Sequence, residues 1–139
     1  AVVIADKQLA LDFPYLVKER GGLLAKGRLL GVQFETAFAG GAANTPDEAL
    51  YWQLARNANV CANHLRSGMI EAGYTPYGDS TSNQQFFIVS PDKAEQFEKS
   101  SGCEVFLTLE DGQKVIRFVC SWATKLNDVD ELLEYAREL

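Results

Sequence analysis

Apolar positions in the first third of the chain predict an opening strand followed by helices. The run AVVIA (1–5) is apolar and β-branched, which is typical of a buried strand with further structure on both sides. We therefore expect additional polypeptide before it. Asp6 is placed to cap a helix over residues 7–20, whose regularity Pro14 limits. Helical spacing then returns over residues 23–38, carried by Leu23, Leu24, Leu30, Phe34 and Phe38.

A longer amphipathic helix is predicted next, from Pro46 to about Ala72. Thr45 precedes it as an N-cap, and Gly73 follows it as a stop signal. The apolar stripe that would face the core consists of Leu50, Leu54, Ala58, Cys61, Ala62, Leu65 and Met69.

After this helix the hydrophobic period changes to that of strands. We expect strands at 84–90, 103–110 and 115–122, with DGQK as the turn of a hairpin between the last two. Ser90 begins a short helix between the first two strands, and Asn127 caps a last helix. The pattern predicts an α+β fold, in which long helices are followed by a small antiparallel sheet covered by helices.

Composition narrows the class of protein. The 139 residues are 47% hydrophobic with a net charge of −6, as in a globular protein and unlike a dedicated nucleic-acid binder. We expect no membrane span and no secretory signal, because charges interrupt each apolar run. Three cysteines without a CxxC motif fit a reducing, cytoplasmic compartment. His64 is the only histidine, so neither a metal site nor a histidine-based nucleophile is predicted.

Two features carry candidate chemistry. Arg117 is the only charge within the strand VIRFVCSW, so it is either a half-exposed hairpin residue or a rigidly held guanidinium that grips a carboxylate. The pair Gly21–Gly22, flanked by cations, is either a solvated face or a phosphate contact, although the P-loop order is absent. The flanking cations are Lys18, Arg20, Lys26 and Arg28.

Polar residues before the first predicted strand of the sheet are a weaker signal. The segment STSNQQ (80–85) reads first as turn-forming, with Asn83 as a residue that could instead fix a loop beside a ligand. Asp79 suits a cap or turn at least as well as a catalytic role.

Three segments, in order, resemble the C-terminal part of threonine aldolase-like enzymes. These enzymes belong to the β-eliminating lyase group of pyridoxal-phosphate proteins with the type I aminotransferase fold. The segments are YLVKERGGLLAKGRLLGVQFE, DSTSNQQFFIV and VIRFVCSWATKLNDVDELL. The resemblance runs along nearly the whole chain, and its pieces KxRGGLLAKGRLLG and IRFVxSWAT are specific.

The resemblance implies a division into parts. Residues 1–45 correspond to the exit segment of a large cofactor domain, 46–73 to a connecting helix and 74–139 to a small C-terminal domain. The lysine that such enzymes join to the cofactor is expected before AVVIA. The large domain is thus implied as a missing partner, and a homo-oligomer with an amino acid substrate is expected.

The resemblance also implies roles for individual residues. Arg117 matches the small-domain arginine that binds the substrate carboxylate, and we expect no catalytic residue in this chain. Gly21, Gly22 and Lys26, with Arg20 as a weaker candidate, match a segment that approaches the phosphate of pyridoxal 5'-phosphate, often that of a neighbouring subunit.

Two functional hypotheses remain. In the first, the chain is part of a lyase that cleaves a β-hydroxy amino acid to glycine and an aldehyde, inactive alone because the lysine is absent. Aldol cleavage and β-elimination are not separated by these residues. In the second, the chain is a non-catalytic α+β module that binds a ligand or partner.

Overall fold

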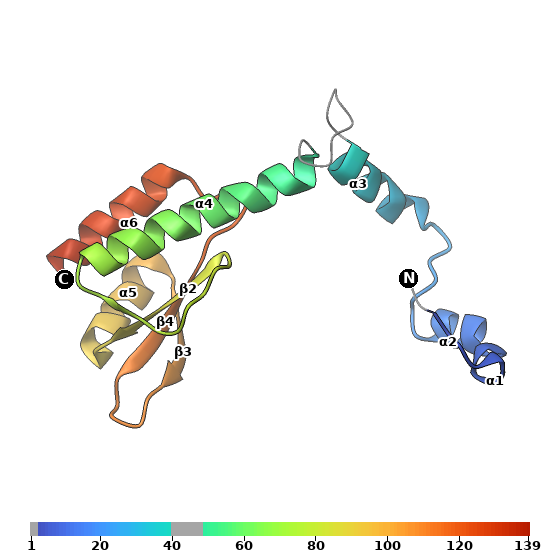
Figure 1. The fold of residues 1–139 in the computed structure, drawn as a ribbon, viewed down its shortest axis with the longest axis horizontal. Coiled ribbons are helices and arrows are strands. Elements are labelled where there is room, and N and C mark those ends of the chain that lie inside the picture. Colours follow the sequence, from blue (N-terminus) through green and yellow to red (C-terminus); the bar gives the residue numbers. More distant parts are fainter. Residues whose placement is uncertain (1–2, 40–48) are drawn as a thin grey trace.

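The computed structural model describes residues 3–39 and 49–139 (Figure 1). Three helices form the N-terminal part, and a long helix, a sheet and two further helices form the C-terminal part. The N-terminal helices are α1 (Lys7–Ala10), α2 (Phe13–Glu19) and α3 (Arg28–Ala39). The C-terminal elements are α4 (Leu50–Glu71), β1 (Thr75–Pro76), β2 (Gln84–Val89), α5 (Pro91–Ser101), β3 (Glu104–Thr108), β4 (Lys114–Val119) and α6 (Leu126–Glu138).

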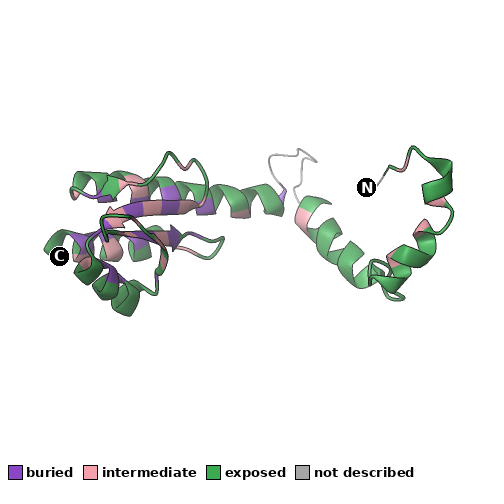
Figure 2. Cartoon of the chain, turned by 90° about the horizontal axis from the view of Figure 1, so that it is seen from below, coloured by how far each residue is buried: buried purple, intermediate pink, exposed green. Residues whose placement is uncertain are grey.

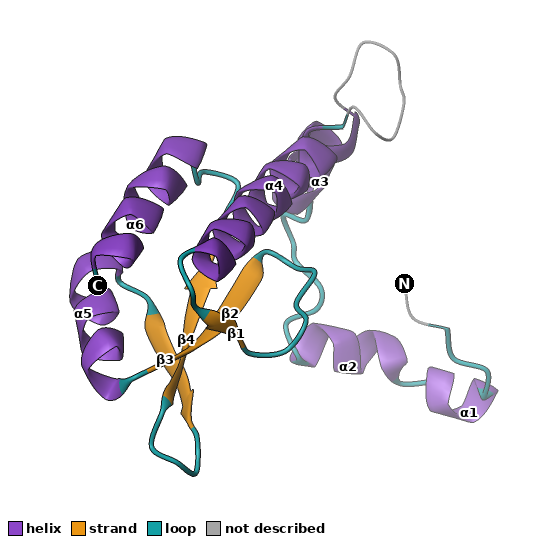
Figure 3. Cartoon of the chain, turned by 60° about the vertical axis from the view of Figure 1, so that its left-hand side comes forward, coloured by secondary structure: helices purple, strands orange, loops and turns teal. Residues whose placement is uncertain are grey.

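The four strands form one antiparallel sheet in the order β1-β2-β4-β3, which confirms the α+β prediction. Helix α5 connects β2 to β3, and β3 turns directly into β4. Figure 3 shows α4, α5 and α6 gathered on one side of the sheet. The sheet therefore has one face covered by helices and one face open.

The core lies between the sheet and these three helices. Phe97 of α5 is fully buried there and makes edge-to-face ring contacts with Tyr74, Phe118 and Tyr135 at centroid distances of 5.7, 5.6 and 5.9 Å. Such ring pairs stabilise a core beyond the area that they bury. In α4 the predicted apolar stripe enters the core at Cys61, Ala62, Leu65 and Met69, whereas Leu50, at the start of the helix, is 42% exposed. Alternating apolar residues of β2 and β4 complete the core.

The capping predictions for the short helices are largely confirmed. Asp6 accepts a hydrogen bond from the Gln8 backbone N–H at 2.8 Å at the start of α1. Ser90 accepts one from the Lys93 N–H at 3.4 Å at the start of α5, where Pro91 occupies the first turn. Serine and aspartate at these positions satisfy donors that the helix itself leaves unpaired.

Other local predictions are wrong. Residues 3–5 form no strand, since a strand needs a hydrogen-bonded neighbour and this segment pairs with none in the described parts of the chain. Helix α3 begins at Arg28 rather than residue 23, after a turn. Asn127 lies inside α6 instead of capping it, and the Asp128 carboxylate accepts the Lys125 N–H at 3.3 Å.

The predicted start of the long helix lies outside the described residues, because Thr45 and Pro46 fall in the segment 40–48. Its predicted end near residue 72 is confirmed, since α4 ends at Glu71. Among the described helices, none combines the length and apolarity needed to cross a membrane.

The N-terminal part differs from the rest in burial. Helices α1, α2 and α3 contain no buried residue, although they carry apolar side chains at helical spacing (Figure 2). Within them Leu9, Tyr15, Leu29 and Phe34 are 70, 76, 70 and 63% exposed.

Candidate functional site

Arg117 lies in the middle of the open face of the sheet. On β4 it is directly opposite Phe86 of β2 on one side and Glu104 of β3 on the other. The helices cover the other face, where its chain neighbours Ile116 and Phe118 belong to the core. Alternation along a strand thus turns Arg117 away from the core and holds it on a rigid element.

A break in the β3–β4 register determines which residue faces Arg117. Near the turn, Thr108 pairs with Lys114 and Leu107 with Val115. That register, continued, would place Val105 opposite Arg117. A bulge between Val105 and Leu107 inserts one residue, so that Glu104 faces Arg117 instead.

The inserted residue, Phe106, completes an aromatic wall beside the arginine. Its ring packs edge-to-face against Phe86 at a centroid distance of 5.0 Å. Phe106 is 50% exposed and Val119, the next outward residue on β4, is 54% exposed. Arg117 is therefore flanked by apolar side chains that are themselves half exposed.

The guanidinium of Arg117 is only partly satisfied. Its Nη2 pairs with the Glu104 carboxylate, while its Nε is buried and has no hydrogen-bond partner. A cavity of about 290 Å³ opens beside this pair, at the end of β4 and the start of β3. It is also lined by core residues from the helix-covered side, namely Leu65, Cys103, Phe118 and Cys120, and by Ser101, Gly102 and Val119. Its volume is close to the lower end of the range of roughly 300–1,000 Å³ for small-molecule sites. An unpaired buried donor beside such a space fits a site for a small anion with two oxygens.

Polar side chains fix the backbone on either side of this strand. Asn83 donates to the Cys120 carbonyl at 2.7 Å, and the Cys120 N–H donates to the Asn83 carbonyl at 2.9 Å. Asn83 therefore ties the loop to the end of β4, beyond Arg117.

A second anchor holds the loop of residues 77–83 to α4. Gln85 is fully buried and donates to the Ser82 carbonyl at 2.9 Å, and its Oε1 accepts from Arg66 at 3.3 Å. Arg66 also pairs with Asp79 at 3.1 Å. Asp79 is thus a partner of a helix arginine, and the amides near it support the fold.

The glycine pair of the N-terminal part is a helix end. Gly21 has a φ of 74°, and its N–H donates to the Lys18 carbonyl at 3.1 Å. The Gly22 N–H donates to the Val17 carbonyl at 2.8 Å. Both amides, which a phosphate would need, are bonded within the C-terminal turn of α2.

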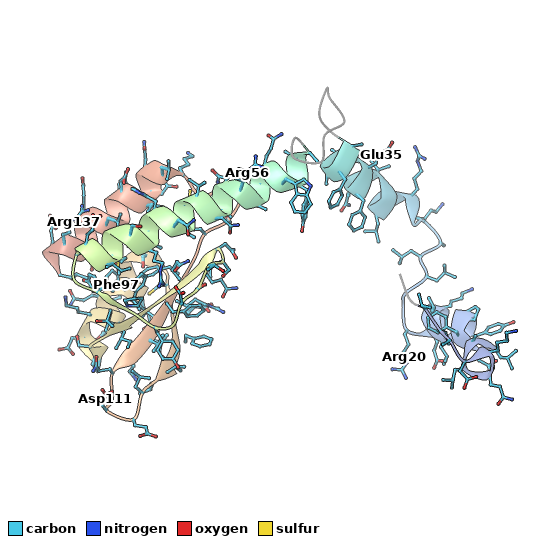
Figure 4. All side chains as sticks on the ribbon, in the orientation of Figure 1. Arg20, Glu35, Arg56, Phe97, Asp111 and Arg137 are labelled. Atoms are coloured by element: carbon cyan, nitrogen blue, oxygen red, sulfur yellow. The ribbon has the colours of Figure 1, made fainter. Side chains whose placement is uncertain are left out.

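The candidate cations near these glycines are exposed, and two of them, Lys26 and Arg28, line one cavity of about 660 Å³. Lys26 lies in the turn before α3, and Arg20 is the C-cap of α2. Figure 4 shows Arg20 well apart from Asp111, which marks the tip of the β3–β4 hairpin. Because the Gly21 and Gly22 amides are already bonded and the cations are exposed, the described residues of a single copy do not form a closed site for pyridoxal 5'-phosphate.

The cysteines are unsuited to nucleophilic or metal chemistry. All three are buried and free, and burial raises the pKa of each thiol, that of Cys120 to about 11. A thiol with a raised pKa is rarely present as the reactive thiolate. Within residues 3–39 and 49–139, no group of three His, Cys, Asp or Glu side chains could hold a metal ion.

Sequence reasoning identified Arg117 and missed Glu104, Phe86 and Phe106. Glu104 is a charged residue at the start of its strand, as is common at an exposed edge. Its pairing with Arg117 depends on the bulge. The segment EVFLT contains no glycine, so its sequence does not indicate a bulge.

No protein-family model matches the sequence, and no curated protein matches it. Among solved structures, the chain is similar to threonine aldolase from Leishmania major, with 29% sequence identity and a TM-score of 0.75. The match covers 90% of this chain and 34% of that enzyme, so the chain spans about a third of the length of the enzyme that it matches. The similarity to that enzyme, in both sequence and fold, extends over nine tenths of this chain.

Proposed function

We propose that this chain is the C-terminal part of a pyridoxal-phosphate-dependent lyase that cleaves a β-hydroxy amino acid to glycine and an aldehyde. The observation that carries the proposal is the placement of Arg117 within a chain similar to threonine aldolase. Arg117 is held by a central strand on the open face of the sheet, with Nε unpaired and a cavity beside it.

Arg117 would bind the α-carboxylate of the substrate. A planar guanidinium presents two parallel N–H groups to a carboxylate, so that it fixes orientation as well as charge. Held in this way, the substrate would keep its Cα–Cβ bond aligned for cleavage. In a complete enzyme the cofactor supplies the electron sink for that cleavage.

The remaining polypeptide of such an enzyme would supply the lysine and most cofactor contacts. We infer that residues 1–45 leave the large domain, that the segment 46–73 with α4 connects it to the small domain, and that residues 74–139 close over the site. The exposed apolar side chains of α1–α3 support this, since none of them is buried and they suit packing against a large domain.

The phosphate contact is proposed to come from a neighbouring subunit of a homo-oligomer. Lys26 and Arg20 are exposed in this chain, which leaves them accessible to a second copy. Because the Gly21 and Gly22 amides are bonded within their own turn, Lys26 would have to carry the contact through its side chain.

Replacement of Arg117 tests the proposal in a complete enzyme that contains this chain. The Arg117→Lys variant keeps the charge and loses the two-point geometry. Hydrogen bonds to charged groups contribute about 1.5–3 kcal/mol, so KM should rise roughly ten- to a hundredfold. Arg137→Lys, at the exposed end of α6, is the matched control and should leave KM unchanged.

The chain without its large domain gives a second test. Added pyridoxal 5'-phosphate should produce no visible absorbance of a lysine-bound cofactor, whereas the complete enzyme should show it.

Unchanged KM in Arg117→Lys would remove the carboxylate role and favour a non-catalytic module. Strong absorbance from residues 1–139 alone would show that a lysine of this chain holds the cofactor.

A further inference from the structure

The partner of Arg117 in this structure is itself a carboxylate. Glu104 occupies the first position of β3, and its carboxylate pairs with Nη2 of Arg117. Glu104 therefore presents to the guanidinium the same chemical group as the α-carboxylate of an amino acid. Two carboxylates that compete for the same Nη2 cannot both bind it at full strength.

A β-bulge in β3 places Glu104 opposite Arg117. Without the bulge at Val105–Leu107, Val105 would face Arg117 and the arginine would have no anion across the strand pair. Bulges are common beside active sites, where they redirect a side chain. This bulge delivers one carboxylate to Arg117 and adds the Phe106 ring to the wall of the same face.

The contact between Glu104 and Arg117 can break easily. The Glu104 side chain is 68% exposed, while that of Arg117 is 30% exposed, so the carboxylate can turn into water while the guanidinium stays in place. β3 is an edge strand, and the bulge interrupts its pairing immediately after Glu104. Exposed ion pairs of this kind contribute little to stability.

The contact with Glu104 also leaves one N–H group of the guanidinium without a hydrogen-bond partner. Glu104 bonds Nη2, and Nε remains buried without a partner. A ligand carboxylate that bonds Nε and Nη2 together would satisfy both groups once the guanidinium turns toward the cavity. A buried donor without a partner destabilises the state in which Glu104 is bound. Exchange of Glu104 for an anion with two oxygens, which would pair Nε as well, is therefore favoured.

We propose that Glu104 is a resident competitor at the Arg117 site: it holds the guanidinium when no substrate is bound, and the substrate carboxylate displaces it. This inference rests on the proposed function of Arg117 as a carboxylate site. The exchange keeps the partly exposed cation paired with a carboxylate in both states, beside Phe86, Phe106 and Val119. It also requires that a ligand carry an anion, since a neutral amide cannot replace Glu104 as a counter-ion.

The test compares carboxylate binding by the 139-residue chain with and without the competitor. The readout is the ¹⁵N signal of the Arg117 Nε–Hε group, assigned by its loss in Arg117→Lys. Acetate is the probe and acetamide its neutral control. Acetate should bind Glu104→Gln about two- to fivefold more tightly than the wild-type chain, the ratio expected when an exposed ion pair no longer competes. Acetamide should shift the Arg117 signal in neither the wild-type chain nor the Glu104→Gln variant.

Glu110→Gln is the matched control variant. Glu110 is an exposed glutamate beyond the opposite end of β3, so the substitution makes the same change in charge away from Arg117. It should bind acetate as the wild type does. In a complete enzyme, Glu104→Gln should lower KM by about two- to fivefold and leave kcat unchanged.

The outcomes separate the two proposals. If acetate shifts the Arg117 signal with equal affinity in the wild type and in Glu104→Gln, the competitor role is wrong and the carboxylate site stands. If KM rises in Glu104→Gln, the glutamate orients Arg117 for the substrate, and displacement is wrong. If acetate moves the signal in neither protein, and Arg117→Lys leaves KM unchanged, the proposed carboxylate site itself is wrong.

Discussion

The two described parts of the molecule use similar apolar sequence to opposite effect. Residues 49–139 bury their apolar positions between a sheet and three helices, with Phe87, Phe97 and Ile116 fully enclosed. Residues 3–39 have leucines and phenylalanines at the same helical spacing and bury none of them. Amphipathic pattern therefore predicts that an element exists, and only the presence of a facing element decides whether it contributes to a core.

The difference in burial between the two parts agrees with the proposed function. Under the proposed function, residues 74–139 would form a small domain that has to be stable by itself. The exit segment would instead depend on the large domain for its burial. Phenylalanine and glycine occur in the helices of both parts, so matched substitutions can compare the two.

The largest effect is expected from paired phenylalanine truncations. Phe97→Ala removes a fully buried ring, which costs about 3–5 kcal/mol of unfolding free energy. Phe34→Ala removes a ring that is 63% exposed, and should change the unfolding free energy by about 0.5 kcal/mol or less. Urea denaturation followed by tryptophan fluorescence measures both, since Trp52 and Trp122 lie in the C-terminal part. An equal loss in the two variants would mean that both parts unfold as one unit.

Paired glycine substitutions should give opposite signs. A Cβ on Gly68 of α4 would lie 2.3 Å from a methyl carbon of the buried Leu133 of α6, so Gly68→Ala should cost about 1–3 kcal/mol. A Cβ on Gly31 of α3 meets nothing within 4 Å. Gly31→Ala should therefore stabilise its helix by roughly 0.5–1 kcal/mol.

Far-UV circular dichroism measures the helix gain in Gly31→Ala, and urea denaturation measures the loss in Gly68→Ala. Destabilisation by Gly31→Ala would show that α3 packs closely against another element in solution. An unchanged Gly68→Ala variant would show that α4 and α6 separate without cost.

The C-terminal fold was predictable because its signals are local. Alternation in QQFFIV and VIRFVC, the Asp111–Gly112 turn and the Ser90–Pro91 helix start all act within a few residues. The failures at residues 3–5 and at Asn127 have other causes. A strand needs a partner that a segment cannot supply itself, and competition between neighbouring capping residues is decided by geometry.

The candidate site was half predictable for a related reason. A lone charge in an apolar strand drew attention to Arg117 from sequence alone. Glu104 faces it only because one residue is inserted in β3, and a shift of register by one residue exchanges the faces of a strand. The Gly21–Gly22 pair shows the reverse ambiguity, since glycines that end a helix and glycines that bind phosphate share a sequence pattern.

A smaller effect than those of Phe97→Ala and Gly68→Ala is expected from the thiols, which are confined to the C-terminal part. Burial, and then the neighbouring Cys61, raise the pKa of Cys120 from its ordinary value of 9.0 to about 11. The folded state therefore holds this proton more tightly than the unfolded state does. The resulting stability is fully present below about pH 9 and is lost as the pH rises toward 11.

Between about pH 8 and pH 10, the loss of unfolding free energy attributable to Cys120 should be roughly 1 kcal/mol. Urea midpoints at several pH values measure it, and Cys120→Ala should flatten the decline. Deletion of residues 1–39 should leave the decline unchanged, because the thiols and the groups around them all lie beyond that segment. A decline that disappears with the deletion would mean that the N-terminal helices help to bury the thiols, and the two parts would then share one core.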